Sequence, residues 1–315
     1  MEPYLLQQSL LTTTTTTTKS SSMISSLPPN SVTCSTNKSN ASSIIFRLIL
    51  ISCIGIISIW ANYEASKGFS ITIVNDASKF SLARKRFSLL YESNDKATRI
   101  VVNTSTFVEN LLYPAYNNNN QDSQKHFKKQ INSVTLRLAA PTNFHDFVSV
   151  DQHSQKPHEY IINLNPSLLE ETRSNNDELV VMAVLQGMAR VWLWDGKGGA
   201  PLVLLNGIVE YITSLAGYRT SELHKFGGGN IISAEKNEIC WKDEDRRKVA
   251  GFLSHFDHRM PPNSGGDGEM IRRLNKEMRN GWDDQMVDDV LGMTSQHACA
   301  SYILMNRHHN PYSSV

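Results

Sequence analysis

The chain has almost no net charge and no concentrated run of one sign. Its 315 residues include 31 Lys and Arg against 30 Asp and Glu, which leaves a formal net charge of +1. Nucleic-acid-binding domains usually carry a basic face or stripe. The sequence shows no such stripe, so we expect no nucleic-acid partner. The one short basic run, Arg84-Lys85-Arg86, is interpreted as a solvated turn.

Cysteine is also scarce, with four residues in the whole chain. Cys34 and Cys53 lie in the N-terminal 60 residues, which leaves Cys240 and Cys299 for the folded part. These two residues either form one disulfide in an oxidising compartment or stay as separate buried thiols. The count of two is compatible with both states.

Acidic residues are nearly absent from the first 60 positions, where Glu2 stands alone. This region opens with a run of seven threonines, Thr12 to Thr18, followed by many Ser, Pro and Asn residues. Such a composition buries too little apolar surface to offset the entropy of ordering the chain. We therefore predict a disordered Ser/Thr-rich tail over residues 1–43.

Residues 44–61 form a long apolar run, IIFRLILISCIGIISIWA, with Arg47 as its single charge. Eighteen such residues are enough for one transmembrane helix, and the arginine can reach the lipid headgroups. The run starts too late for a cleaved signal peptide. We therefore predict a signal anchor in a lipid bilayer, on the secretory pathway or at the plasma membrane, with a lumenal or extracellular C-terminal domain. The alternative is a plastid, because the acid-poor, Ser/Thr-rich tail is typical of transit peptides.

Patterns of regular structure begin after residue 68. β-branched residues alternate with others in three short runs that predict strands, namely Phe69–Asn75, Val134–Leu138 and Glu159–Leu164. Apolar residues at helical spacing predict helices over residues 97–113, 177–194, 202–216, 243–256, 269–280 and 283–304. These elements predict one α/β (α+β) domain over residues 69–305, followed by a short tail over residues 306–315.

Residues 185–218 carry the most specific pattern, LQGMARVWLWDGKGGAPLVLLNGIVEYITSLAGY. The pattern resembles the plant basic secretory protein family, whose members have zincin-like peptidase domains. The resemblance rests on five segments, Val191–Trp194, Asp195–Gly198, Ala200-Pro201, Gly207–Tyr211 and Ala216–Tyr218. It implies a zincin-like domain with a small N-terminal mixed sheet and a helical C-terminal half, here preceded by one transmembrane helix.

The positions that would carry metal chemistry in this family hold other residues. The resemblance places the two metal histidines of the HExxH motif on Gln186 and Arg190, the general-base glutamate on Gly187, and the third ligand on Asn206. A guanidinium has no lone pair to offer a metal, and a catalytic zinc needs three protein ligands. We therefore predict a catalytically inactive pseudopeptidase with no catalytic residues, no bound metal and no cofactor.

In the implied fold, Gln186, Arg190, Asn206 and Glu210 converge at the former metal site. We expect Arg190 to pair with Glu210 or another nearby acid, because a buried charge without a partner is destabilising. In a second hypothesis, Arg190 stays available and holds a carboxylate, such as a peptide C-terminus, through two parallel hydrogen bonds. The expected partner is then a peptide or protein, and the resemblance links such a role to plant defence.

The sequence leaves two other hypotheses for the function open. The chain is a hydrolase that uses a site other than HExxH, although no nucleophile-elbow pattern is present, or it is a structural relic with a filled, ligand-free site. His255 and His258 are spaced three apart on a predicted helix. No third metal ligand follows from their spacing, so we interpret them as surface histidines.

Overall fold

The computed structural model describes residues 40–66, 68–114, 128–140, 146–153, 155–170, 176–218, 239–259 and 267–309. Side chains of the first helix are described over residues 44–59. The chain forms two units, Met1–Gly68 and Phe69–Val315. The predicted disordered tail lies outside the described residues up to position 39, and so do residues 310–315 of the predicted C-terminal tail.

The described residues of the first unit form the helix α1 (Asn40–Ser66), which extends beyond both ends of the predicted segment 44–61. Its isoleucine, leucine and phenylalanine side chains between Ile44 and Ile59 are exposed. The predicted transmembrane helix is not supported, because a search of the described residues finds no helix with the length and apolarity needed to cross a membrane.

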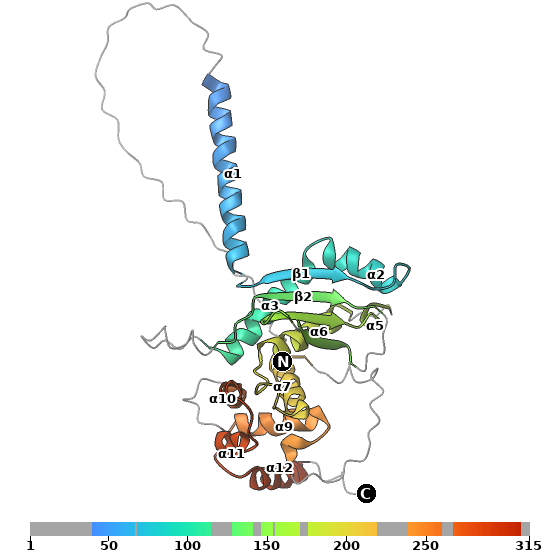
Figure 1. Cartoon of the computed structure of the whole chain (residues 1–315), viewed down its shortest axis with the longest axis vertical. Helices are drawn as coiled ribbons and strands as arrows, with labels where there is room; N and C mark the ends of the chain where they lie inside the picture. The colour runs from blue at the N-terminus through green and yellow to red at the C-terminus, as the bar shows by residue number, and fades with distance from the viewer. Residues whose placement is uncertain are drawn as a thin grey trace, which may run out of the picture. The chain divides into compact units, whose positions relative to one another are not determined.

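A four-stranded mixed sheet opens the second unit (Figure 1). The strand order is β1-β2-β4-β3, in which β1, β2 and β4 run parallel and β3 is the antiparallel edge strand. The three predicted strands are confirmed. The fourth was missed because its burial is partial and scarcely alternates. The strands are β1 (Ser70–Asn75), β2 (Ser133–Leu138), β3 (Val148–Gln152) and β4 (Glu159–Leu164).

Two long helices pack on this sheet and on each other, α3 (Lys96–Leu112) and α6 (Asn176–Trp192). Twelve residues of α6 are buried, so this helix is the centre of the core. At its C-terminal end, the indole nitrogen of Trp192 donates a hydrogen bond to the hydroxyl of Ser105 on α3 over 2.9 Å. The predicted core helix is confirmed. Because α6 is held firmly in the core, it also holds in place the side chains that it contributes to the cavity described below.

The basic run 84–86 lies in a helix and not in a solvated turn. It belongs to α2 (Leu82–Phe87), which continues into η1 (Ser88–Glu92). The guanidinium of Arg84 donates to the carbonyl oxygens of Asn75 and Ala77 over 2.9 and 2.7 Å. Arg86 donates to the carbonyl oxygen of Leu169 over 2.8 Å, at the end of the short helix α5 (Ser167–Glu170). Both arginines therefore satisfy backbone acceptors where chain segments meet.

Helices α7 (Leu202–Leu215) and α9 (Arg246–Asp257) form a close pair in the C-terminal half. Gly207 permits this approach, since a Cβ atom built there would lie 2.2 Å from a methyl group of Val249. Asp257 then ties α9 and α7 to the next helix: it accepts hydrogen bonds from the Tyr211 hydroxyl and from the backbone N–H groups of Gly268 and Met270. The remaining helices are α10 (Glu269–Met278), α11 (Gln285–Leu291) and α12 (Ser295–His309).

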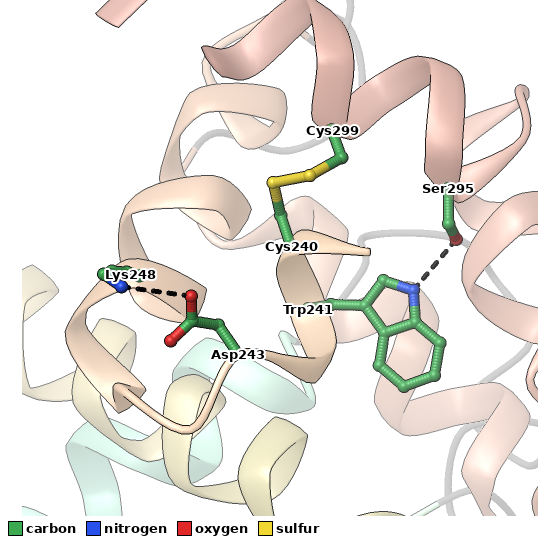
Figure 2. Close-up of a disulfide and its surroundings, with 6 residues drawn as sticks. All are labelled: Cys240, Trp241, Asp243, Lys248, Ser295 and Cys299. Carbon is green, nitrogen blue, oxygen red and sulfur yellow. Dashed lines mark hydrogen bonds and ion pairs between the residues drawn. A yellow bond between two sulfur atoms is a disulfide. The ribbon is translucent and has the colours of Figure 1, made fainter. Parts of the chain in front are cut away.

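A disulfide joins Cys240 to Cys299, with Cα atoms 5.3 Å apart. It links η2 (Cys240–Lys242) to α12, and Figure 2 shows it beside the indole of Trp241. That indole nitrogen donates to the hydroxyl of Ser295 over 2.9 Å, so the covalent link and the hydrogen bond hold the same two elements together. Of the two states open from the sequence, the structure has the disulfide.

Candidate functional site

Helices α6 and α7 bring four of the predicted residues to the wall of one cavity of about 390 Å³. Gln186, Gly187 and Arg190 lie on one face of α6, because residues four apart stack along a helix, and Asn206 faces them from α7. The edge strand β3 supplies a second wall through Val148, Ser149, Val150 and Gln152. Of the four residues expected to converge, Gln186, Arg190 and Asn206 therefore line one cavity, whereas Glu210 is buried and is not among the lining residues.

The packing of α6 on β4 leaves little room at Gly187, the position where the resemblance implies a general base. A Cβ atom built on Gly187 would lie 2.6 Å from Cγ2 of Ile162, which is itself fully buried. Real Cβ contacts are never this short, so the Ile162 side chain occupies the volume where a side chain at position 187 would start. A glutamate at this position would require the sheet side chain to move.

Arg190 brings a positive charge into the cavity wall. Burial lowers the pKa of its guanidinium, Arg246 lowers it further, and Asp146 opposes the shift. Within the described ranges, no carboxylate lies at ion-pair distance from this guanidinium. The acid that acts on Arg190 electrostatically is thus Asp146, which is exposed and lies just before β3.

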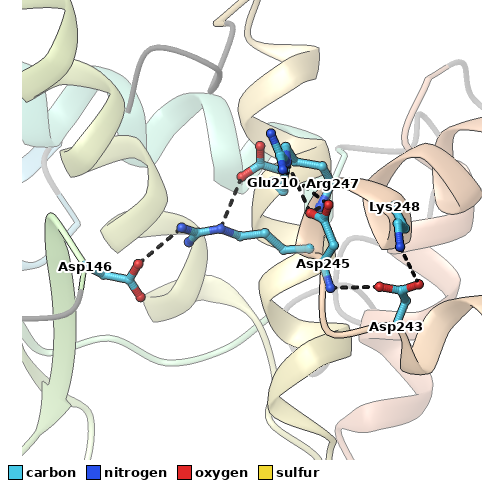
Figure 3. Close-up of polar contacts among 7 residues, drawn as sticks. Asp146, Glu210, Asp243, Asp245, Arg247 and Lys248 are labelled. Carbon is cyan, nitrogen blue, oxygen red and sulfur yellow. Dashed lines mark hydrogen bonds and ion pairs between the residues drawn. The ribbon is translucent and has the colours of Figure 1, made fainter. Parts of the chain in front are cut away.

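The expected pairing of Arg190 with Glu210 is wrong, because α9 delivers another arginine to that carboxylate. The Nε atom of Arg246 lies 4.0 Å from Glu210 Oε2, and its Nη2 atom lies 3.1 Å from Asp146 Oδ1. Figure 3 shows Glu210 and Asp146 on either side of the guanidinium that joins them. The 4.0 Å contact is long, so the shorter bond to Asp146 is the stronger of the two.

The start of α9 fixes the position of Arg246. Asp245 is the N-cap, and its carboxylate accepts a hydrogen bond from the backbone N–H of Arg247 over 3.0 Å. The helix was predicted from position 243, so the first turn was misplaced and Arg246 was not recognised as a site residue. The signal for the correct start of α9 was Asp245, because aspartate is a preferred N-cap residue.

Comparison with known families shows which protein family contains this domain. A family model described as BSP, peptidase of plants and bacteria, matches residues 66–302. The chain belongs to this family. The resemblance seen in residues 185–218 is therefore confirmed, and it extends over the whole second unit apart from its last residues. Searches of curated proteins and of solved structures found no match.

The zinc that the BSP resemblance implies does not fit the residues in this cavity. Arg190 presents a cation without a lone pair, Gln186 and Asn206 are neutral amides, and Gly187 lacks both a carboxylate and the room for one. Across the described ranges, no three His, Cys, Asp or Glu side chains come close enough together to hold a metal ion.

His255 and His258 do not form a metal pair. The His255 ring packs against the rings of Phe256 and Tyr302, and desolvation lowers its pKa. His258 is exposed, with Nδ1 lying 2.6 Å from the carbonyl oxygen of Ser254. The interpretation as surface histidines therefore holds for His258 and is wrong for His255, which is partly buried with a buried Nε2 atom.

A buried lysine that the sequence did not reveal completes the cavity. Lys129 is 9% exposed and lies before β2, and its amino group donates to the carbonyl oxygen of Leu193 over 2.6 Å. That carbonyl lies one residue beyond the C-terminal end of α6, where the helix dipole favours a cation. Lys129 lies outside every predicted helix and strand, so no pattern in its neighbourhood marked it as buried.

Proposed function

We propose that this BSP-family domain has lost metallopeptidase activity and binds a carboxylate ligand through Arg190. The observation that carries the proposal is a largely buried guanidinium at a former metal-ligand position, on the wall of a cavity of about 390 Å³. A guanidinium in such a setting gains most from a carboxylate that accepts two parallel hydrogen bonds. The amides of Gln186 and Asn206 add neutral donors beside it.

The C-terminus of a peptide is the carboxylate that best suits this cavity. Strand β3 lines it and is the edge strand of the sheet formed by the described residues. Extended peptides commonly bind by adding a strand to such an edge. The peptide backbone would then lie along β3 while its terminal carboxylate reaches Arg190.

Calorimetry with a pool of hexapeptides that carry either a free or an amidated C-terminus tests this proposal. The free acids should bind more tightly to the wild type, and Arg190→Gln should weaken their binding roughly 10- to 100-fold, the range for a lost charged hydrogen-bond pair. Arg99→Gln is the matched control, because Arg99 is exposed on α3 and does not line the cavity. Equal binding of acids and amides, or no saturable binding, would refute the carboxylate role.

Loss of metallopeptidase activity is tested by the zinc content of the purified protein. The wild type should contain no stoichiometric zinc. A gain-of-metal variant would carry Gln186→His, Gly187→Glu, Arg190→His and Asn206→Glu, together with Ile162→Ala to make room at position 187. Zinc in the variant alone supports the proposal. About one zinc per wild-type chain, or hydrolysis of peptides that chelators abolish, would contradict it.

Attachment to a lipid bilayer through residues 44–61 is a second part of the proposal, with the BSP domain on the lumenal or extracellular side. Its support is the row of exposed apolar side chains from Ile44 to Ile59. Burying such side chains in hydrocarbon gives roughly 1.5 to 3 kcal/mol each. The full chain should float with liposomes on a density gradient, and a chain lacking residues 1–68 should not. Equal behaviour of the two chains would rule the attachment out.

A further inference from the structure

The amino group of Lys129 belongs to the wall of the cavity, and not only to the interior beneath it. Its Nζ atom lies 5.1 Å from the centre of the Tyr160 ring and 5.6 Å from that of Trp194. Its hydrogen-bond acceptor is Leu193. All four residues line the cavity, so the charged end of the lysine lies among residues of the cavity wall.

This environment favours a neutral amine. Desolvation lowers the pKa of Lys129 to about 8, and Asp195 opposes the shift. Two tyrosines lie nearby: Tyr160, whose pKa burial raises, and Tyr113, whose pKa burial raises to about 12. Arg190 lines the same cavity, and Arg279 acts electrostatically on Tyr113. A surface lysine with an ordinary pKa of about 10.4 is under about 1% neutral at that pH.

We propose that Lys129 is a nucleophilic amine that forms an imine with small carbonyl compounds entering the cavity. The lone pair of the neutral amine attacks the carbonyl carbon, an N–C bond forms, and the carbonyl oxygen leaves as water with two protons. The product is an imine, and its protonated form retains one N–H that can still donate to Leu193. Desolvated lysines act as nucleophiles toward carbonyls in this way.

The preferred carbonyl compound carries a carboxylate, which makes small 2-oxo acids the expected class. Arg190 lines the same cavity as Lys129 and supplies the matching cation. This choice of class rests on the proposed carboxylate site, whereas imine formation itself does not.

The test uses the full-length wild type with glyoxylate as the probe and cyanoborohydride to reduce any imine to a stable secondary amine. Peptide mapping by mass spectrometry then gives the labelling rate of each lysine. At pH 7.5 Lys129 should be labelled at least about 10-fold faster than the exposed residues Lys79 and Lys85, because its neutral fraction is larger. Its rate should rise through an apparent pKa of about 8. The comparison lies within one folded molecule, so it requires no variant.

Two variants separate this inference from the proposed function. Lys129→Arg keeps a cation beside Leu193 and should abolish the fast label, and Arg190→Gln should slow labelling by glyoxylate but not by the neutral aldehyde glycolaldehyde. If Lys129 reacts with neither aldehyde faster than Lys79, the imine inference is overturned while carboxylate binding measured by calorimetry stands. If both aldehydes label Lys129 and Arg190→Gln changes neither rate, the amine is confirmed and the choice of 2-oxo acids is wrong.

Discussion

At the residue scale, Gly187 shows how closely α6 packs on the sheet. Glycine in a helix interior costs about 1 kcal/mol relative to alanine, so the sequence alone suggests that Gly187→Ala would stabilise α6. The structure predicts the opposite. The new methyl group would meet Ile162 at 2.6 Å, and overpacking of a core typically costs about 1 to 3 kcal/mol.

Urea unfolding of Gly187→Ala measures this balance, and the free energy of unfolding should fall by about 1 to 2 kcal/mol. A double-mutant cycle with Ile162→Ala isolates the contact, because the double variant should be more stable than the sum of the two single changes predicts. Strict additivity, or a stabilised Gly187→Ala, would show that the two residues do not compete for the same volume.

The free energy of unfolding should depend on pH through the titration of Lys129. Its pKa is about 8 in the folded chain against about 10.4 in the unfolded chain, so the unfolded state binds more protons between these values. Stability from this group therefore rises as pH increases. Relative to Lys129→Met, which cannot titrate, the wild type should gain about 2 kcal/mol in the free energy of unfolding from pH 7 to pH 9.5.

Chemical denaturation of the two proteins at several pH values provides the comparison. The difference between them is what matters, because the tyrosines titrate alike in both. Buried Tyr113 has its pKa raised to about 12, so it opposes the lysine in the wild type only above about pH 10. A pH-independent difference would show that Lys129 is charged in the folded protein.

At the scale of elements, the Cys240–Cys299 disulfide holds the last helix to the domain. The two cysteines are 59 residues apart. Closing a loop of that length in the unfolded chain is worth up to about 4 kcal/mol on the chain-entropy model. The double variant Cys240→Ala/Cys299→Ala should lose stability toward that limit, as measured by urea unfolding, and a reductant should not change it further.

Cys53→Ala is the matched control, since this thiol is exposed on α1 and free. Its unfolding should equal that of the wild type with and without reductant. A wild type whose stability is the same in oxidising and reducing buffer would contradict the stabilising role of the disulfide.

At the scale of the whole molecule, the core of the second unit is self-contained. Every buried apolar residue in the described ranges lies between Ala77 and Cys299. Removal of residues 1–68 should therefore leave the thermal midpoint within about 2 °C of the full chain, because the buried apolar core lies in the second unit. Differential scanning calorimetry of both chains makes the test. A shift of more than about 5 °C would show that the first unit contributes to the fold.

The sequence by itself determined the family, the three parallel strands and the core helices. It also singled out Gln186, Gly187, Arg190 and Asn206, which line one cavity. These features follow from period and spacing, which are local properties of a chain. The sequence did not predict the edge strand β3, the helical conformation of Arg84 or the boundaries of α9. Partial burial and helix capping produce only weak patterns in the local sequence.

Only the tertiary structure decided which charges meet and which volumes are filled. Arg246 reaches Glu210 in place of Arg190, Ile162 occupies the space beside Gly187, and Lys129 enters the cavity wall. It also decided that Cys240 and Cys299 are bonded. The physical reason is the same in each case: burial and ion pairing depend on distances between segments far apart in the chain, and no periodicity along the sequence encodes those distances.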